Sequence, residues 1–471
     1  MQSIGKYRIR GLLGRGGMGK ILKVEVPVIR RILALKLFSP RETLAVVAGR
    51  PHLERLFTQE AVTLAGIRHV NITEVFDFGT FRGRPYYTMD YYGNTLGVVI
   101  GEGRRPEAPS RILRVDKVAE YGRQILNGLQ RLHASGIIHR DIKPFNVLLT
   151  DQDTVKLCDF GLSKLHGETM PATPQLKVGS PFYAAPEQEA DPEAVEAAAD
   201  LYAVGVIIYR MLTGRLPRAP LTPASSINPD LDAAWDRFLS CALAPRPADR
   251  HPEAAAMAAE LADLFKRWQD RKAAACRLAD PAGEADESPS AAERQRPRAH
   301  SLRTGPRDPR PIFGLTPLWQ PVRYRTRGFQ AWPQRGTLRD AATGLEWQVG
   351  GSAFPMDWDA ALQAIAELNT HRWADADDWR LPTVAELLTL LRPPPPDSDD
   401  CLPPDFAPHQ KRLWSCDRRT YTSAWYVSLE LGFVAWQDRT FACHVKAVRT
   451  FSDGVCRVAP VTEAAGRAPA A

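Results

Sequence analysis

The alternation of apolar and polar positions divides the chain into three regions. From residue 7 to about residue 270, short alternating runs typical of strands give way to longer runs with apolar residues three or four apart. Residues 271–335 show no such period and are rich in Ala, Pro, Arg, Asp and Glu, and the pattern returns at 336–455. We therefore expect an α+β domain, a disordered linker, a smaller α+β domain and a flexible tail at 456–471.

A glycine-rich segment between two apolar runs opens the first region. In LLGRGGMGKILKVEV, Gly14, Gly16 and Gly19 fit the pattern G-x-G-x-x-G, and Ile21 follows the last glycine by two residues. Glycine permits a positive φ and lets backbone N–H groups approach phosphate oxygens. A dinucleotide-binding turn has the same glycines but continues into a helix, whereas this segment continues into a strand-like alternation. A plain glycine-rich hairpin remains an open alternative on this segment alone.

A charged residue interrupts the next apolar strand. The run ILALKLF at 32–38 carries Lys36 on a face that would otherwise be buried or half-buried. A buried ammonium group is costly unless it is paired. The helical stretch LERLFTQEAVTLAGI offers Glu60 as the partner, with Glu54 as the nearest competitor. A Lys–Glu pair of this kind orients the ammonium group toward the α- and β-phosphates of a nucleotide.

Two polar clusters follow further along the chain. The segment HRDIKPFNVLL at 139–149 places several polar side chains before a strand, and a polar turn with a capping Asp is its simplest interpretation. The segment VKLCDFGLS then supplies Asp159, at a spacing from Asn146 that fits a hairpin. Such a hairpin would bring two oxygen donors together, and we expect them to hold Mg²⁺. Asp141 would then accept the proton of an attacking hydroxyl, and Lys143 would neutralise the transferring phosphoryl group.

In this order, the segments resemble the eukaryotic-type Ser/Thr protein kinases of bacteria. The resemblance covers residues 7–270 and rests on GRGGMG, the strand Lys, the helix Glu, HRDIKPFN, DFG, GSPFYAAPEQ, DLYAVGVIIYRMLTGRLP and PADR. It implies a bilobal fold with a β-rich N-terminal lobe, a helical C-terminal lobe and ATP between them. It also implies transfer of the γ-phosphoryl group of Mg·ATP to Ser or Thr hydroxyls of protein substrates, with Mn²⁺ able to replace Mg²⁺.

The resemblance also assigns the residues that contact the nucleotide. Met89 matches the gatekeeper position, just before a hinge that ends near Tyr92. The full set of expected nucleotide contacts is Leu13, Gly14, Gly16, Gly19, Ile21, Lys36, Glu60, Met89, Asp90 and Tyr92. Asp90 stands where the family usually has Glu, and none of the departures from the family pattern removes a catalytic group.

Structural and regulatory roles follow from the same resemblance. Glu187 would pair with Arg250, and Asp200 would anchor the catalytic loop. Arg140 precedes the catalytic Asp and needs an anion, which a phosphorylated loop residue would supply. We expect autophosphorylation to provide that anion, and its sites would be Thr169 or Thr173. Ser180, together with Lys143, matches the pattern of kinases directed to Ser and Thr.

The second folded region resembles a different family, the Lcl-type C-terminal domains of bacteria, which are thought to be C-type-lectin-like. The resemblance is carried by TGLEWQ, DWRLPTVAEL, LWSCD, AWYVSL and VKAVR, between residues 343 and 449. We expect helices at 357–369 and from Thr383, where Glu386 would complete a capping box. Such folds present variable loops on a rigid scaffold, which predicts an unknown ligand or protein partner. Asp375, Asp377 and Asp378 suggest Ca²⁺, but a solvated loop is the favoured interpretation.

Composition adds limits to this picture. The formal net charge is +7, and basic residues crowd between Arg294 and Arg327, where a solvated linker is favoured over a nucleic-acid contact. No apolar run approaches the ~20 residues that span a bilayer. The N-terminus lacks a signal-peptide core, so we expect a cytoplasmic protein. The seven Cys have no CxxC spacing, which argues against a metal site and predicts free thiols, with a disulfide among the last four left as the less favoured alternative.

Together these observations predict an active Ser/Thr kinase that acts in signal transduction by phosphorylation. The C-terminal region would recruit a substrate or sense a ligand. The alternative is a scaffold in which the kinase region only binds nucleotide while the C-terminal region does the work. The intact set of Lys36, Asp141, Asn146 and Asp159 argues against that alternative.

Overall fold

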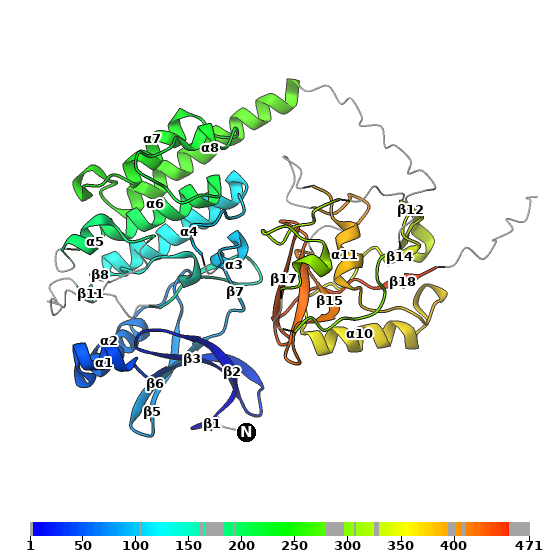
Figure 1. Ribbon diagram of the computed structural model, residues 1–471, viewed down its shortest axis with the longest axis horizontal. Helices are drawn as coiled ribbons and strands as arrows, with labels where there is room; N and C mark the ends of the chain where they lie inside the picture. Colours follow the sequence, from blue (N-terminus) through cyan, green and yellow to red (C-terminus); the bar gives the residue numbers. More distant parts are fainter. Residues whose placement is uncertain are drawn as a thin grey trace, which may run out of the picture. The chain divides into compact units, whose positions relative to one another are not determined.

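The chain divides into two units, Met1–Gly283 and Glu284–Ala471 (Figure 1). The computed structural model describes residues 3–103, 105–159, 164–165, 182–191, 195–278, 296–305, 308–324, 329–393, 401–406 and 410–451. Within these ranges, every helix is too short or too polar to cross a lipid bilayer.

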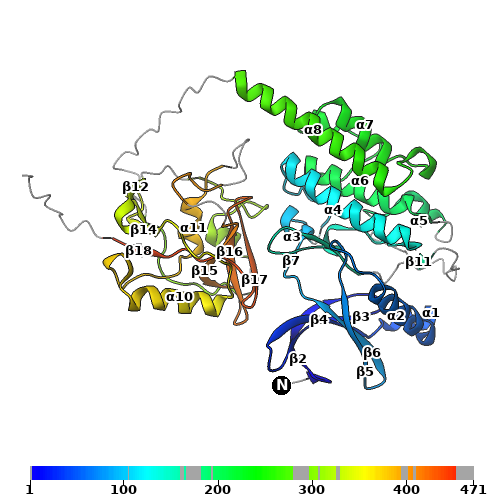
Figure 2. The same cartoon turned by 180° about the vertical axis from the view of Figure 1, so that it is seen from behind.

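An antiparallel sheet of six strands, in the order β1-β2-β3-β4-β6-β5, opens the first unit. Its strands are β1 (Ser3–Ile4), β2 (Tyr7–Arg15), β3 (Gly19–Val26), β4 (Arg31–Phe38), β5 (Val75–Phe81) and β6 (Arg84–Asp90). Between β4 and β5, the chain forms α1 (Glu42–Ala48) and α2 (Arg50–Ala65), which lie together beside the sheet (Figures 1 and 2). Phe57 fixes α2 on the sheet, because its ring centroid lies 5.5 Å from that of Phe38 and 5.3 Å from that of Tyr87.

Helices make up most of the remainder of the first unit. They are α3 (Leu96–Ile100), α4 (Val115–Ala134), α5 (Pro186–Ala190), α6 (Ala198–Thr213), α7 (Ala233–Ala242) and α8 (Ala254–Leu278), with short 3₁₀ turns at Pro144–Asn146, Ala224–Ser226 and Pro247–Asp249. All but two of the sixteen residues of α6 are buried, which explains its almost uninterrupted apolar sequence. A Cβ on Gly205 would lie 2.9 Å from the Cβ of Ala242, so α6 and α7 approach closely only because glycine stands there.

Short strands place the two polar segments predicted from the sequence, which contain Asn146 and Asp159. The strands β7 (Asn94–Thr95), β9 (Val147–Leu149) and β10 (Val155–Leu157) form a small sheet in the order β10-β9-β7, and β8 (Ile137–Ile138) pairs with β11 (Lys164–Leu165). In the β9–β10 hairpin, Val147 pairs with Leu157 and Leu149 with Val155. This register confirms the hairpin expected from sequence, and it sets the residues just before β9 beside those just after β10.

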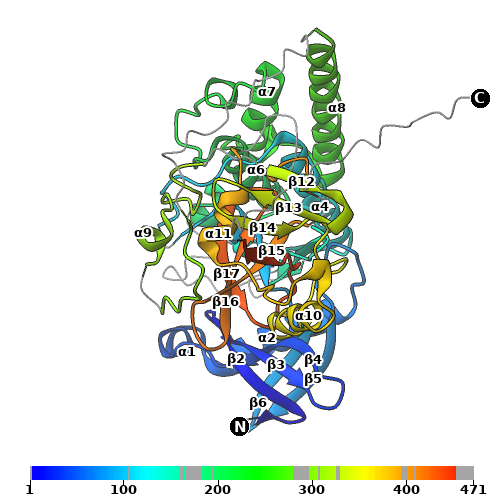
Figure 3. The ribbon, with the colours of Figure 1, turned by 90° about the vertical axis from the view of Figure 1, so that its right-hand side faces the viewer.

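The second unit packs its helices against two sheets. One sheet has the order β12-β13-β14-β18, from Phe329–Trp332, Thr337–Asp340, Leu345–Gln348 and Val448–Thr450; the other has β15-β16-β17, from Arg412–Arg418, Ser423–Ser428 and Phe433–Asp438. Its helices are α9 (Arg310–Phe313), α10 (Trp358–Thr370) and α11 (Val384–Leu390), with 3₁₀ turns at Pro333–Arg335 and Trp373–Asp375 (Figure 3). Thr383 and Glu386 form the expected capping box at the start of α11.

The expected linker at 271–335 differs from the structure at both ends. α8 continues to Leu278, beyond the expected domain end at residue 270. Residues 296–305 and 308–324 belong to the second unit, where Phe313 and Leu315 join its apolar core. No hydrophobic period marks this segment, because individual side-chain and backbone hydrogen bonds hold it and its one helix, α9, is only a single turn long. Residues 279–295 of the expected linker lie outside the described residues.

Asp417 is the main anchor of this segment. Its carboxylate is fully buried and accepts hydrogen bonds from Arg298 Nη1 at 3.0 Å and Nη2 at 2.7 Å. It also accepts from the backbone N–H groups of Leu302 and Val384, each at 2.7 Å. One carboxylate therefore ties residues 298–302 to the start of α11. This pairing also accounts for one of the arginines that had suggested a nucleic-acid contact.

We predict that Asp417→Ala lowers the free energy of unfolding of the second unit by about 3–5 kcal/mol, because it leaves the Arg298 guanidinium and two backbone N–H groups without their acceptor. Urea unfolding followed by tryptophan fluorescence measures the change. Asp308→Ala is the matched control, since Asp308 pairs with Arg310 at the surface and should cost about 1 kcal/mol or less. Equal destabilisation by the two variants would contradict this account of the segment.

Candidate active site

Lys36 is the charged centre of the first unit. It lies on β4 with its side chain toward α2, and only 5% of its surface is exposed. Its Nζ donates to Glu60 Oε1 at 2.8 Å and Oε2 at 3.0 Å. It also donates to Asp159 Oδ1 at 2.9 Å. The structure thus pairs Lys36 with Glu60 rather than with Glu54, and it adds the carboxylate that follows β10.

The electrostatics of this cluster keep its ammonium group and Asp159 charged. Burial alone lowers the pKa of Lys36, but Asp159 and Glu60 together outweigh burial and hold that pKa well above its usual value. The Lys36 charge in turn lowers the pKa of Asp159. Burial raises the pKa of Glu60, and Lys36 only partly opposes that rise. The cluster therefore presents one cation and at least one anion in a site from which most water is excluded.

Tyr87 is a member of this cluster that sequence reasoning missed. Its hydroxyl donates to Glu60 Oε1 at 2.9 Å. In the register of β4 and β6, Tyr87 stands directly opposite Lys36. The sequence contains two adjacent tyrosines in this strand, and only the pairing of the strands shows which of them faces α2. Burial, followed by the Glu60 charge, raises the pKa of Tyr87 well above its usual value, so Tyr87 acts as a neutral donor.

A second cluster forms in the loop before β9. Lys143 Nζ donates to Asp141 Oδ2 at 2.6 Å. Asn146 Nδ2 donates to the same oxygen at 3.0 Å and to the backbone oxygen of Asp141 at 2.8 Å. Because the Asn146 side-chain amide donates both hydrogen bonds to Asp141, the amide oxygen of Asn146 can bind another partner. Asp141, Lys143 and Asn146 are therefore held as a single group.

Asp200, at the start of α6, fixes the backbone of this loop. Its Oδ2 accepts from the N–H of His139 at 2.9 Å, and its Oδ1 accepts from the N–H of Arg140 at 2.8 Å. His133 Nε2 lies 2.8 Å from Oδ2. Burial raises the pKa of Asp200, but these hydrogen bonds outweigh it and lower the pKa overall. Arg140 itself has a positive φ of 66°, so these contacts hold a backbone conformation that non-glycine residues seldom adopt.

A partly buried ion pair braces α5. Arg250 Nη1 donates to Glu187 Oε1 at 2.6 Å, and Nη2 donates to Oε2 at 2.7 Å. Gln188 Nε2 donates to the backbone oxygen of Arg140 at 2.9 Å, which connects α5 to the catalytic loop. Sequence reasoning expected the ion pair but not the role of Gln188. Three expected regulatory residues lie outside the described residues: Thr169, Thr173 and Ser180.

The glycine-rich turn lies between β2 and β3. None of Gly14, Gly16 and Gly19 has the positive φ that glycine permits. Only Gly19 requires glycine, because a Cβ there would lie 2.5 Å from the backbone oxygen of Leu37. The space around Gly14 and Gly16 is open. Gly16 N donates to Gly19 O at 2.9 Å, which closes the turn between β2 and β3. On either side of it, Leu13 is exposed and Ile21 is partly buried.

The expected hinge lies where β6 ends. Met89 is buried in the apolar cluster that also contains Phe57. Asp90 ends β6, and its carboxylate accepts from Arg31 Nη2 at 3.0 Å and from the hydroxyl of Tyr92 at 3.2 Å. The side chain of Asp90 therefore braces the connection between the sheet and the helical part. Burial, with the nearby Asp90 charge, raises the pKa of Tyr92.

Comparison with known proteins identifies two families along the chain. A family model of the protein kinase domain matches residues 7–271, and one of the Lcl C-terminal domain matches residues 336–449. Serine/threonine-protein kinase Pkn1 of Myxococcus xanthus is 36% identical over 272 residues, which cover 54% of this chain and 37% of that protein. Serine/threonine-protein kinase PksC of Streptomyces coelicolor is 35% identical over 288 residues, which cover 56% of this chain and 50% of that protein.

Among solved structures, the Mycobacterium tuberculosis PknI kinase domain is 30% identical, with a TM-score of 0.42, and the match covers 56% of this chain and 97% of that one. The chain spans half or less of the length of the two curated relatives above. The kinase family model, in contrast, matches more than half of this chain and includes both polar clusters and the turn before β3. The chain therefore belongs to the protein kinase family.

Proposed function

We propose that the protein is an active Ser/Thr protein kinase that transfers the γ-phosphoryl group of Mg·ATP to hydroxyls of protein substrates. One observation carries the proposal: Lys36 on the sheet contacts both Glu60 on α2 and Asp159 after β10. That contact joins the sheet to the hairpin that also begins at the catalytic loop. A chain that only bound nucleotide would not need Asp141 and Lys143 held together next to this point.

The residues of the chain divide the chemistry among them. Asp141 would accept the proton of the attacking hydroxyl, since its carboxylate is held by Lys143 and Asn146 on one side. Lys143 would stay near the transferring group and offset its negative charge. Lys36 would leave Asp159 for the α- and β-phosphates while Glu60 keeps its ammonium group in position. These steps need positioning and charge rather than covalent catalysis.

The donors present fit a divalent cation of the Mg²⁺ type. The amide oxygen of Asn146 and the carboxylate of Asp159 are hard oxygen donors, and the side chain of Asp159 is 34% exposed, so it is open on one side. When bound there, the cation would bridge the phosphates and screen their charge. Mn²⁺ accepts the same oxygen donors.

The second unit would act as a ligand- or substrate-binding module that serves the kinase. Its C-type-lectin-like character remains a prediction, as does the cytoplasmic location of the protein. Asp375, Asp377 and Asp378 each pair with an arginine: Arg335 at 3.3 Å, Arg372 at 3.0 Å and Arg449 at 2.9 Å. These aspartates are thus better explained as surface ion pairs.

We predict that Asp141→Asn lowers the rate of phosphoryl transfer by about 10²–10⁴-fold while ATP still binds, because the proton acceptor is lost and the phosphate contacts remain. Transfer from radiolabelled ATP to a generic basic protein measures the rate, and nucleotide titration measures binding. Asp151→Asn, on the exposed turn between β9 and β10, is the matched control and should leave both unchanged. Equal turnover in wild type and Asp141→Asn would overturn the assignment.

The Lys36 cluster generates a second prediction, which compares three single variants. Lys36→Met should lower transfer by about 10²–10³-fold because the phosphates lose their fixed cation. Glu60→Gln should have a smaller effect, about tenfold, because the amide oxygen that replaces the carboxylate can still accept a hydrogen bond from Lys36 Nζ. Glu54→Gln on the same helix should have no effect. Thermal unfolding of each variant separates lost activity from lost folding, and a larger loss in Glu54→Gln than in Glu60→Gln would disprove the proposed pairing.

The third prediction concerns the loop residues outside the described ranges. We predict that incubation with Mg·ATP phosphorylates Thr169 or Thr173, because a phosphate there would supply an anion for the basic region around Arg140. Mass spectrometry of the incubated wild type, with Asp141→Asn incubated in parallel, detects the modification. A fully active enzyme with an unmodified loop would refute this prediction.

A further inference from the structure

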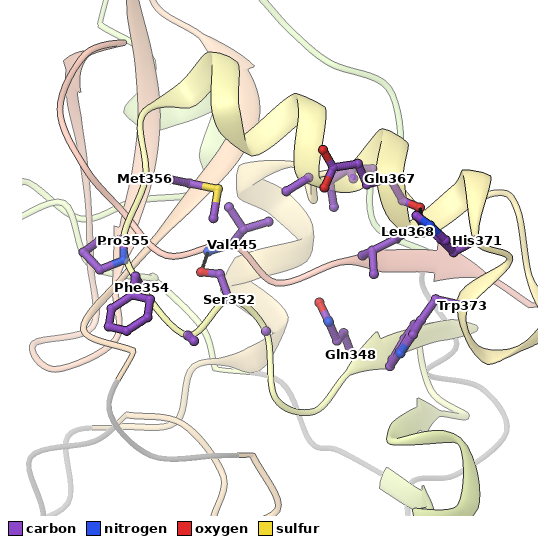
Figure 4. Close-up of a pocket in the computed structure, with 14 residues that line it drawn as sticks. Gln348, Ser352, Phe354, Pro355, Met356, Glu367, Leu368, His371, Trp373 and Val445 are labelled. Carbon is purple, nitrogen blue, oxygen red and sulfur yellow. Dashed lines mark hydrogen bonds between the residues drawn. The ribbon is translucent and has the colours of Figure 1, made fainter. Parts of the chain in front are cut away.

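The second unit contains a pocket that lies far in sequence from every residue of the proposed kinase site. Its volume is about 630 Å³, within the range of small-molecule sites. Figure 4 shows it between α10, the loop that follows β14, Trp373 and Val445. The lining is mostly apolar and includes Met356, Ile365, Leu368 and Val445. Such a lining favours a ligand with a sizeable apolar body.

Hydrogen bonds within the chain hold the loop that forms one wall of the pocket. Ser352 N donates to Val445 O at 2.8 Å, and Val445 N donates to Ser352 Oγ at 2.9 Å. From the other side, Gln410 Nε2 donates to the backbone oxygens of Gly350 at 2.7 Å and Ser352 at 3.0 Å. Gly351 has a φ of +66°, and a Cβ there would meet both Gln410 and Val445. The loop is therefore preformed, which reduces the entropy lost when a ligand binds.

The helix side of the pocket presents hydrogen-bond acceptors. His371 Nδ1 lies 2.8 Å from the backbone oxygen of Glu367, and because a carbonyl oxygen only accepts, Nδ1 carries the hydrogen; in the uncharged form of the ring, Nε2 is an acceptor. The Glu367 carboxylate lines the same side, and it accepts from Gln363 Nε2 at 3.2 Å. Glu367 lies in the last turn of α10 and His371 is the residue that caps the helix, so both are at the end where the helix dipole is negative. The last turn of α10 contains no basic residue.

The arginines near this end of α10 are engaged with carboxylates. Arg372 pairs with Asp377 at 3.0 Å, and Arg335 pairs with Asp375 at 3.3 Å. Carboxylates therefore offset the charges of these two arginines. Among the residues of α10 that line the pocket, Glu367 carries the charged side chain. Trp373 adds an aromatic surface to the wall, and indole faces attract cations.

We propose that this pocket binds a small organic cation: an amine or quaternary ammonium group carried on an apolar body. The cationic group would lie near Glu367, His371 and Trp373, and the apolar body would lie along Met356, Leu368 and Val445. The pocket would give the second unit a defined ligand class. It stands independently of the kinase activity, because none of its residues takes part in phosphoryl transfer.

Dansylcadaverine tests the proposal, because it is a fluorescent primary amine on an apolar ring system. Its N-acetylated form keeps the body and removes the charge. The titration uses full-length protein with excess Mg·ADP, so that the proposed nucleotide site is occupied. We expect saturable binding of the amine and at least about tenfold weaker binding of the acetylated form. Glu367→Gln should weaken amine binding about tenfold and leave the acetylated form unchanged. No saturable binding, or equal affinity for the two probes, would overturn the proposal.

Two further variants locate the probe. Ala364→Phe should fill the pocket and abolish binding of both probes, whereas binding that persists in this variant would place the probe elsewhere and overturn the proposal. Asp405→Asn removes an exposed carboxylate outside the pocket and is the matched control for Glu367→Gln. It should leave the affinity for the amine unchanged. If Asp405→Asn lowered this affinity as much as Glu367→Gln, the effect would be nonspecific charge attraction, which would contradict the proposal. Unfolding curves that match wild type confirm that each variant is folded.

Discussion

The buried ammonium group of Lys36 is the interaction on which the first unit depends. It connects Glu60, which is 24 residues away in sequence, and Asp159, which is 123 residues away. Burying the Lys36 cation with the Glu60 carboxylate is costly, and such a cluster persists only when each partner, including the partly exposed Asp159, is well placed. The strand register, the packing of α2 through Phe57 and the β9–β10 hairpin together provide that placement. Removing any one of these elements would leave a buried charge without its partner.

Asp200 plays the corresponding role for the catalytic loop. Its carboxylate accepts hydrogen bonds from two backbone N–H groups and contacts one imidazole. These contacts hold a backbone conformation with positive φ at Arg140. The loop can then present Asp141, Lys143 and Asn146 from one short segment. The two clusters meet where β10 ends, because the backbone N–H of Cys158 donates to the backbone oxygen of Asn146 at 3.1 Å. Residues from four separated segments (β4, α2, the loop before β9 and the end of β10) therefore form one site.

The parts of this site that contain a costly buried charge or an unusual spacing could be predicted from the sequence. A Lys inside an apolar strand demanded a partner, and the spacing between Asn146 and Asp159 fitted a hairpin. Sequence reasoning could not reach Tyr87 or Gln188, because their roles depend on strand register and on contacts between distant helices. It also took the Pro- and Arg-rich segment at 296–324 for a linker, since individual contacts such as Arg298 with Asp417 leave no period in the sequence. The pocket beside α10 was likewise invisible, because its walls come from four segments of the second unit.

The central claim is that the two clusters form one phosphotransfer site, and a direct assay of the transfer product tests it. Full-length protein would be incubated with γ-labelled ATP, Mg²⁺ and a basic protein, and the protein-bound label would then be separated as phosphoamino acids. The account predicts label on phosphoserine or phosphothreonine. Release of inorganic phosphate without labelled protein, or label confined to phosphotyrosine, would contradict it.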